Sequence, residues 1–250
     1  HLYSKNMSRS DLNKKIYIPN YLCFGQFEID DFRHHGIEVK NFFKVGSLNL
    51  ANFFHYIKEN KIKLKKFVYD ICLISEGVPG MDDFIGEKNI EKGFVATMKF
   101  TIKFCMKHNM KLIFTWRRDK RLSPASYKAE LVYYKKYLTD SEFNYLISNS
   151  LENNRQTYSS YAAMAQSKVV VGFTSTMLRE YLAVGGKILS CKLIPLDVYD
   201  FPIQGICSIE NCTFPEFEKR LLEIHLMSKE NYFSQLSKDK CYTAEYNENI

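Results

Sequence analysis

The feature of this sequence that most constrains its fold is the alternation of short apolar runs with amphipathic segments. Four runs rich in Val, Ile, Leu and Phe have the length and composition of buried strands: 67–77, 110–116, 168–171 and 187–191. After the first run, Phe94, Met98 and Ile102 recur every four residues, as on a helix that packs on a sheet. Strands that alternate with helices imply right-handed crossovers and a parallel sheet. We therefore expect an α/β fold with a Rossmann-like parallel sheet and helices on both faces.

Weaker patterns predict the rest of the chain. They favour strands at 16–24, 39–48 and 143–148, and helices at 49–61, 126–138, 158–166, 176–184 and 214–228. A short helix that ends at Gly36 separates the first two of these strands. The basic tract from Lys61 to Lys66 is typical of a linker or a domain boundary. We expect the last dozen residues to be poorly ordered.

Charge is distributed unevenly along the chain. The 250 residues are 46% hydrophobic and 25% charged, which is a globular composition, and the net charge is +7. Residues 1–125 hold 22 Lys/Arg against 13 Asp/Glu, whereas residues 126–250 hold 13 against 15. A basic half suits phosphate-bearing ligands or an anionic membrane surface. The alternative is a solvated basic face without a partner.

Several classes of protein are disfavoured. The seven cysteines include no C-x-x-C pair, which indicates reduced cysteines in an intracellular protein rather than disulfides or a zinc site. No apolar run approaches the roughly 18–20 residues of a membrane span, and no signal peptide is visible. The lack of H-E-x-x-H, P-loop, G-x-G-x-x-G and G-x-S-x-G motifs counts against zinc proteases, P-loop kinases, nicotinamide enzymes and serine hydrolases. We expect a cytoplasmic protein with neither a resident metal nor a cofactor.

The turn between the strand 168–171 and the helix that follows it is the main candidate site. Ligands of parallel sheets bind at the carboxyl ends of the strands. Here Gly172 is followed by Thr174, Ser175 and Thr176, three hydroxyl residues at a helix N-terminus. Unpaired N–H groups and the helix dipole stabilise a phosphate at such a terminus, and hydroxyls add donors. The alternative is an ordinary N-cap, which stabilises a helix by about 1 kcal/mol.

Charged residues near the other strand ends could complete this site. The run 117–121 contains Arg117, Arg118, Lys120 and Arg121 just past a strand, where guanidinium groups could grip a pyrophosphate. Glu180, one helical turn beyond the hydroxyl turn, could bind ribose hydroxyls. The alternatives are a charged surface loop for the basic run and a solvent-facing glutamate for Glu180.

Carboxylates and serines supply further candidates. Glu76, Asp82 and Asp83 follow a predicted strand, and any of them could act as a general base toward an acceptor hydroxyl. Ordinary loop acidity is the alternative. Ser159 and Ser160 open a predicted helix near the same strand ends, where they could border a ligand or cap the helix.

Three stretches carry a resemblance to a known family: FFKVGSLNL, YDICLISEG and SSYAAMAQSKVVVGFTSTMLREYLAVGGKILSC. Together they resemble the C-terminal half of GT-B glycosyltransferases. They are more closely similar to bacterial surface carbohydrate biosynthesis proteins related to the CDP-glycerol and CMP-Kdo transferase groups. The resemblance covers roughly residues 16–235. One departure is that no His-Pro pair follows the strand that ends at Trp116.

The resemblance implies roles for the candidate residues. Thr174, Ser175 and Thr176 would hold the donor phosphate, Glu180 would lie near the ribose, and Ser159 and Ser160 would border the nucleotide. Arg117 would stand where related enzymes place a His-Pro or basic element. The implied domains are the end of an acceptor-side domain (1–60), a nucleotide-sugar donor domain (61–214), and a C-terminal helix and tail (215–250).

The resemblance also implies a function. We expect a glycosyltransferase, or its donor-binding half, that moves a sugar from a CMP- or CDP-type nucleotide donor to a glycan or lipid-linked acceptor of a bacterial surface polysaccharide. Nucleic acid is not expected as a partner, and the basic half is compatible with peripheral contact with the inner membrane. Two alternatives remain: a non-catalytic binding module in glycan assembly, and a polyol-phosphate transferase that keeps the donor turn but uses another acceptor.

Overall fold

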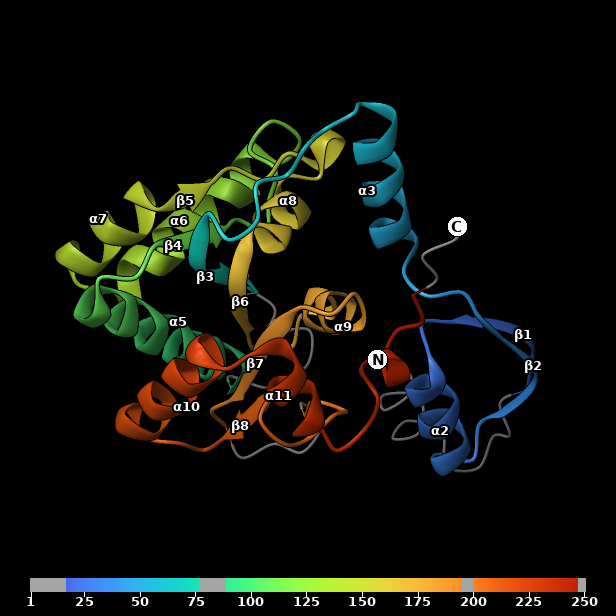
Figure 1. Ribbon diagram of the computed structural model, residues 1–250. Helices are drawn as coiled ribbons and strands as arrows, with labels where there is room; N and C mark the ends of the chain where they lie inside the picture. The colour runs from blue at the N-terminus through green and yellow to red at the C-terminus, as the bar shows by residue number, and fades with distance from the viewer. Residues whose placement is uncertain (1–16, 77–88, 195–199, 247–250) are drawn as a thin grey trace.

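A six-stranded parallel sheet forms the centre of the molecule (Figure 1). The computed structural model describes residues 17–76, 89–194 and 200–246. The strands of this sheet are β3 (Tyr69–Ile74), β4 (Leu112–Thr115), β5 (Ser150–Leu151), β6 (Ser167–Gly172), β7 (Lys187–Lys192) and β8 (Ser208–Glu210). They lie in the order β5-β4-β3-β6-β7-β8, and every neighbouring pair is parallel. The predicted fold class is confirmed.

Helices cover both faces of this sheet, which explains why the middle residues of its central strands are apolar and buried. The helices are α5 (Asn89–His108), α6 (Pro124–Tyr137), α7 (Asp140–Ser148), α8 (Ser159–Ala165), α9 (Thr176–Ala183) and α10 (Phe214–Leu226). On one face α5 contacts β3, β6 and β7 and also packs against α7 and α10. On the other face α8 and α9 pack side by side over β6. Phe94, Met98 and Ile102 of α5 are fully buried in the core, as their spacing predicted.

The order of the strands creates one switch point. From β3 the chain runs outward through β4 and β5, then returns to β6 on the other side of β3 and continues through β7 and β8. The helices that follow β3 and β6, α5 and α9, therefore lie on opposite faces of the sheet. Crevices at such points are where open parallel sheets bind ligands.

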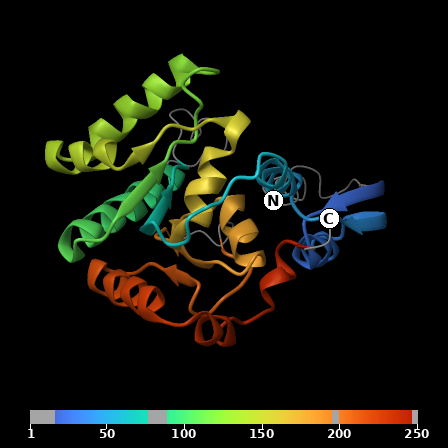
Figure 2. The ribbon, with the colours of Figure 1, turned by 45° about the horizontal axis from the view of Figure 1, so that its top comes forward.

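The N-terminal residues form a smaller unit. Strands β1 (Tyr17–Cys23) and β2 (Glu38–Lys44) pair in parallel around α2 (Gln26–His34), and α3 (Leu48–Glu59) leads from this unit to the large sheet. In Figure 2 this unit lies beside the C-terminal segment and α3. The two sheets are separate, but the domain limits 1–60, 61–214 and 215–250 remain a prediction. The buried face of α10, with Phe217, Leu221 and Ile224, belongs to the core of the large sheet.

The prediction of a strand at residues 143–148 is wrong. These residues lie in α7, which begins at a capping box between Thr139 and Glu142. The box satisfies free amide groups at the helix start, and Phe143, Leu146 and Ile147 then fall on one helical face. Strand β8 and helix α11 (Lys229–Ser234) were not predicted.

The last dozen residues are also better ordered than predicted, as far as residue 246. The 3-10 helix η3 (Lys240–Tyr242) contacts α2 and α9, and Thr243 and Ala244 that follow it are fully buried. Glycine is required at position 25, because the Cβ of any larger residue would lie 2.9 Å from the backbone of Tyr242 and Ala244. The tail therefore joins the N-terminal unit to the large sheet. Neither α5 nor any other helix in the described ranges combines the length and apolarity needed to cross a bilayer.

Asp70 at the start of β3 gives a pH-dependent contribution to stability. Its Oδ1 accepts a hydrogen bond from Lys168 Nζ at 2.8 Å and lies 3.0 Å from His225 Nε2, and its Oδ2 accepts from Lys111 N at 2.9 Å. Burial raises the pKa of Asp70, but these hydrogen bonds outweigh burial and lower it from 3.8 to about 2. The stabilisation is thus present above pH 4 and is lost as the pH falls toward 2.

We therefore expect Asp70→Asn to lower the free energy of unfolding by about 2 kcal/mol at pH 7 and by much less near pH 2. Urea unfolding at a series of pH values measures this difference. Glu223→Gln, at an exposed position of α10, is the control and should change little at either pH. A loss that is the same at pH 7 and pH 2 would contradict the assignment.

Candidate functional site

Glu76 links the carboxyl ends of β3 and β6 at the switch point. It follows β3, and its side chain crosses to the turn after β6. Its Oε1 accepts from Phe173 N at 2.5 Å, and its Oε2 accepts from Thr174 N and from Thr174 Oγ1, the latter at 2.7 Å. The carboxylate thus accepts hydrogen bonds from the backbone amides that we predicted would face a phosphate.

The side chain of Glu76 is buried and closely packed. Its exposed fraction is only 6%, and burial raises the pKa of its carboxyl group despite the hydrogen bonds from the turn, which lower it. A Cβ at Gly172 would lie 2.8 Å from Glu76 Oε1, so glycine permits this close approach. Glu76 was predicted as a candidate general base. In the structure it holds the turn in place, and an acceptor hydroxyl would reach it only after the side chain moved.

The hydroxyl turn keeps part of its donor capacity. Ser175 is the N-cap of α9, and its Oγ accepts from Met177 N at 3.3 Å. Because a hydroxyl that accepts can still donate, the capping alternative does not exclude ligand binding. Thr174 and Thr176 are exposed on either side of this cap. The turn therefore holds Glu76 with its backbone and with the Thr174 hydroxyl, while Thr176 lies exposed on its outer side.

The basic run after β4 divides into two parts. Arg117 is exposed and donates from Nη1 to the backbone oxygen of Glu76 at 3.0 Å, so it lies at the switch point. Arg118 has a buried Nε with no hydrogen-bond partner in the described part of the chain. Lys120 instead pairs with Glu152 at 3.0 Å on the surface.

Asp119 organises the outer half of this run. It is buried and accepts hydrogen bonds from Arg121 N, Nε and Nη2 and from Arg155 N. The Arg121 guanidinium lowers the pKa of Asp119, against the effect of desolvation. Arg121 is thereby turned toward Asn154 and away from the switch point. Of the four predicted basic residues, Arg117 is the one hydrogen-bonded to Glu76 in the described ranges.

A buried polar cluster behind Glu76 was not predicted. Ser75 donates to Glu130 Oε1 and contacts the hydroxyl of Tyr134, which also donates to Glu130 at 2.7 Å. Trp116 stacks on Tyr134 with ring centroids 5.6 Å apart. Glu130 Oε2 and Trp116 Nε1 are buried without a hydrogen-bond partner among the described residues. A glutamate within the buried face of α6 is the one signal in the sequence that could have pointed to this cluster.

Glu180 faces the N-terminal unit. Its carboxylate is 1% exposed and accepts from Ser47 Oγ and from Tyr161 OH, the latter at 2.9 Å. Burial raises the pKa of Glu180, and these two hydrogen bonds oppose that effect. Ser47 is also the N-cap of α3. The predicted ribose ligand is therefore engaged by the chain itself, and its role toward a nucleotide stays a prediction.

The remaining predicted residues lie apart from Glu76 or beyond the described ranges. Ser159 Oγ donates to Glu152 O and accepts from Asn154 N, so it closes the loop before α8. Ser160 is half-buried in the first turn of α8. Asp82 and Asp83 lie outside the described residues. Within the described ranges, no group of three His, Cys, Asp or Glu side chains is arranged to hold a metal ion.

Comparison with known proteins points to one biological process. Residues 94–196 match the sequence model of a family described as "putative O-antigen biosynthesis protein". The matched segment runs from α5 past β7 and includes Arg117 and the hydroxyl turn. No curated protein matches the chain. The segment that carries most of the candidate site is thus similar to proteins of bacterial surface carbohydrate biosynthesis.

Proposed function

We propose that this chain is a glycosyltransferase of the GT-B type, or its donor-binding half, and that it takes part in the synthesis of a bacterial surface polysaccharide. One observation carries the proposal: Arg117 and Thr174, far apart in sequence, are both hydrogen-bonded to Glu76 at the switch point. The similarity of residues 94–196 to an O-antigen biosynthesis family supports the process. The donor is a nucleotide-activated sugar, CMP- or CDP-linked, that lies across the ends of β3 and β6.

The donor phosphate binds between the basic run and the hydroxyl turn. Arg117 approaches it from the end of β4, and the hydroxyls of Ser175 and Thr176 approach it from the start of α9. Glu76 sits behind the turn and fixes its backbone, so the hydroxyls are oriented before the donor arrives.

The chemistry follows from this placement. The acceptor oxygen attacks the anomeric carbon of the donor sugar, the bond from that carbon to the phosphate oxygen breaks, and the nucleotide leaves with the electron pair. Arg117 stabilises the negative charge that develops on the phosphate. The acceptor proton passes to a carboxylate, for which Glu76, Asp82 and Asp83 are the candidates.

A nucleotide screen by thermal shift tests this proposal. We expect one of CMP, CDP, UDP and GDP, or its sugar conjugate, to raise the melting temperature of the protein, because a ligand that binds only the folded state stabilises it. The base of the nucleotide that raises the melting temperature identifies the class of donor. A protein that responds to none of them would contradict donor binding.

One observation favours a second candidate, a non-catalytic module of glycan assembly. The carboxylates of Glu76 and Glu180 are both buried and both engaged by groups of this chain. A transferase that had lost its activity could keep such carboxylates for structure alone. The absence of any nucleotide response in the screen would favour this module. A polyol-phosphate transferase would respond to the same nucleotides and would differ in its acceptor.

A further inference from the structure

Strand β2 has an open edge. Among the described residues it pairs with β1 alone. Val45 N donates to Cys23 O, and Phe43 O accepts from Cys23 Sγ, so the backbone groups of odd-numbered residues face β1. Backbone groups alternate sides along a strand, and those of Glu38, Lys40, Phe42 and Lys44 therefore point outward. A row of free N–H and C=O groups is a template for pairing with another strand.

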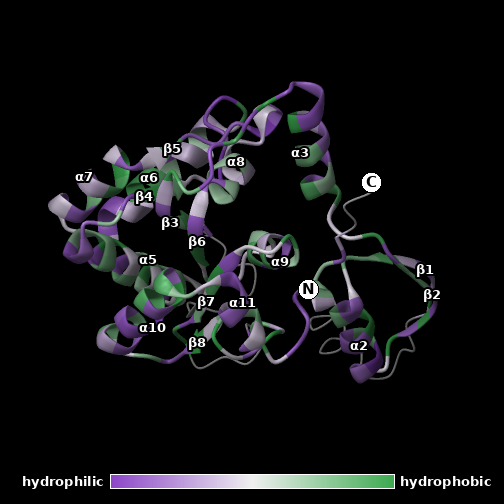
Figure 3. Cartoon of the chain, in the orientation of Figure 1, coloured by the Kyte–Doolittle hydropathy of each residue, from purple (hydrophilic) through white to green (hydrophobic). Residues whose placement is uncertain are grey.

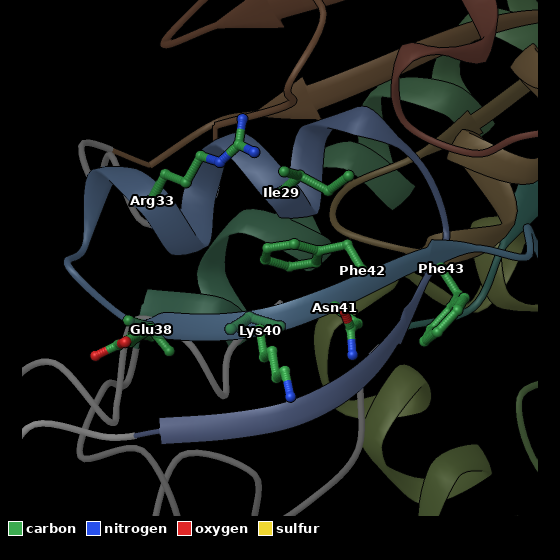
Figure 4. Close-up of a pocket in the computed structure, with 9 residues that line it drawn as sticks. Ile29, Arg33, Glu38, Lys40, Asn41, Phe42 and Phe43 are labelled. Atoms are coloured by element: carbon green, nitrogen blue, oxygen red, sulfur yellow. The ribbon is translucent and has the colours of Figure 1, made fainter.

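Two large apolar side chains near this edge are exposed. Phe43 is 48% exposed, and Leu22 of the neighbouring strand is 63% exposed. Hydrophobic and hydrophilic residues occur together along β2 in Figure 3. A pocket of about 570 Å³ lies between α2 and β2, with Phe42 pointing toward Ile29 (Figure 4). A sheet of two strands is also small for independent stability, which favours the addition of further strands.

We propose that two copies of this chain associate through antiparallel pairing of their β2 strands, centred on Asn41. In this register Glu38 of each copy lies opposite Lys44 of the other, which gives two pairs of opposite charge. Lys40 lies opposite Phe42 of the second copy, and Val39 lies opposite Phe43. The residues placed opposite each other with outward backbone groups, 38 with 44 and 40 with 42, are those that can exchange hydrogen bonds.

Charge excludes the neighbouring registers. A shift that centres the pairing on Lys40 places two Lys40 ammonium groups opposite each other. A shift that centres it on Phe42 places Lys40 opposite Lys44 twice. Like charges directly opposite destabilise a sheet, whereas opposite charges stabilise it. Among the registers that pair at least five of the seven residues of β2, the one centred on Asn41 is therefore the self-complementary one, which is the reason to assign a second copy as the partner.

The rest of the molecule is compatible with this dimer. Lys44 already pairs with Glu245 at 2.8 Å, but both side chains are partly exposed, and an ammonium group has three donors. The product is a four-stranded sheet in the order β1-β2-β2-β1, with the α2 helices of both copies on one face. The pairing leaves the ends of β3 and β6 outside the interface, so it does not depend on the proposed transferase activity.

Sedimentation velocity over a range of protein concentrations tests this inference. We expect a reversible dimer, and we expect Glu38→Lys to weaken its formation at least about tenfold, because the introduced ammonium group would face Lys44 of the second copy. The double variant Glu38→Lys/Lys44→Glu restores opposite charges and should recover the dimer. Lys219→Glu on α10 is the control for a charge reversal elsewhere and should leave association unchanged.

Two results would overturn the inference. One is a wild-type protein that stays monomeric up to about 100 μM, since even a weak specific interface has a dissociation constant near this range. The other is a dimer that forms equally well in Glu38→Lys. Circular dichroism and thermal melting of each variant establish that it is folded, so a loss of association is not confused with unfolding.

Discussion

Replacing Arg179 with Met is expected to lower the free energy of unfolding by about 3–5 kcal/mol, because it leaves a buried carboxylate without its partner. Arg179 is 4% exposed. Its Nη2 donates to Glu28 Oε1 at 3.2 Å and to the backbone oxygen of Thr243 at 2.6 Å, and its Nε donates to the same oxygen at 3.2 Å. The guanidinium also lies over the rings of Phe24 and Phe27.

These contacts make Arg179 the link between three segments. It projects from α9 of the large sheet, Glu28 belongs to α2 of the N-terminal unit, and Thr243 belongs to the C-terminal tail. Its removal should therefore loosen the tail as well as the ion pair. Hydrogen exchange should show faster exchange at residues 243–246 in the variant than in the wild type.

Urea unfolding measures the loss, and two further variants interpret it. Arg33→Met removes an exposed guanidinium from α2 and should change stability by no more than about 0.5 kcal/mol. Glu28→Gln/Arg179→Met replaces the stranded carboxylate with a neutral amide that still accepts from Phe24 N, and should be more stable than Arg179→Met alone. A loss of stability below about 1 kcal/mol in Arg179→Met would be typical of an exposed ion pair. It would contradict the role of Arg179 in joining the three segments.

The central sheet could be predicted because its strands are buried on both faces. β3, β4, β6 and β7 each contain a short buried apolar run, and the stripe on α5 has a helical period. Residues 143–148 were mistaken for a strand because a short apolar run fits either structure, and the capping box that decides it lies outside the run. The buried tail could not be predicted, since its order depends on Arg179 and Glu28, which are distant in sequence.

The convergence of Glu76, Arg117 and Thr174 followed from a general rule. Each of them lies at or just past the carboxyl end of a predicted parallel strand, and such strand ends meet at one edge of the sheet. What the rule does not specify is which group fills the turn. Glu76 binds the backbone amides that we predicted would bind a phosphate. It can do so because it is buried beside Gly172, where its Oε1 accepts a hydrogen bond from Phe173 N at 2.5 Å. The partners of Glu180 depend likewise on how the N-terminal unit packs.

Binding of the donor should depend strongly on Arg117. The side chain is exposed and hydrogen-bonded to Glu76 O, and a guanidinium has five N–H donors, so this bond is compatible with phosphate binding. A charge-assisted hydrogen bond contributes about 1.5–3 kcal/mol, so Arg117→Met should weaken the affinity for the responding nucleotide by about 10–100-fold. Lys120→Met is the matched control, because Lys120 already pairs with Glu152 on the surface.

Isothermal titration calorimetry of the wild type, Arg117→Met and Lys120→Met with that nucleotide is the most direct measurement of whether the switch point binds the donor phosphate. We expect the affinity to fall in Arg117→Met and to stay within about twofold of the wild type in Lys120→Met, where no direct phosphate contact is removed. Unchanged affinity in a folded Arg117→Met, or an equal loss in both variants, would contradict the proposed site.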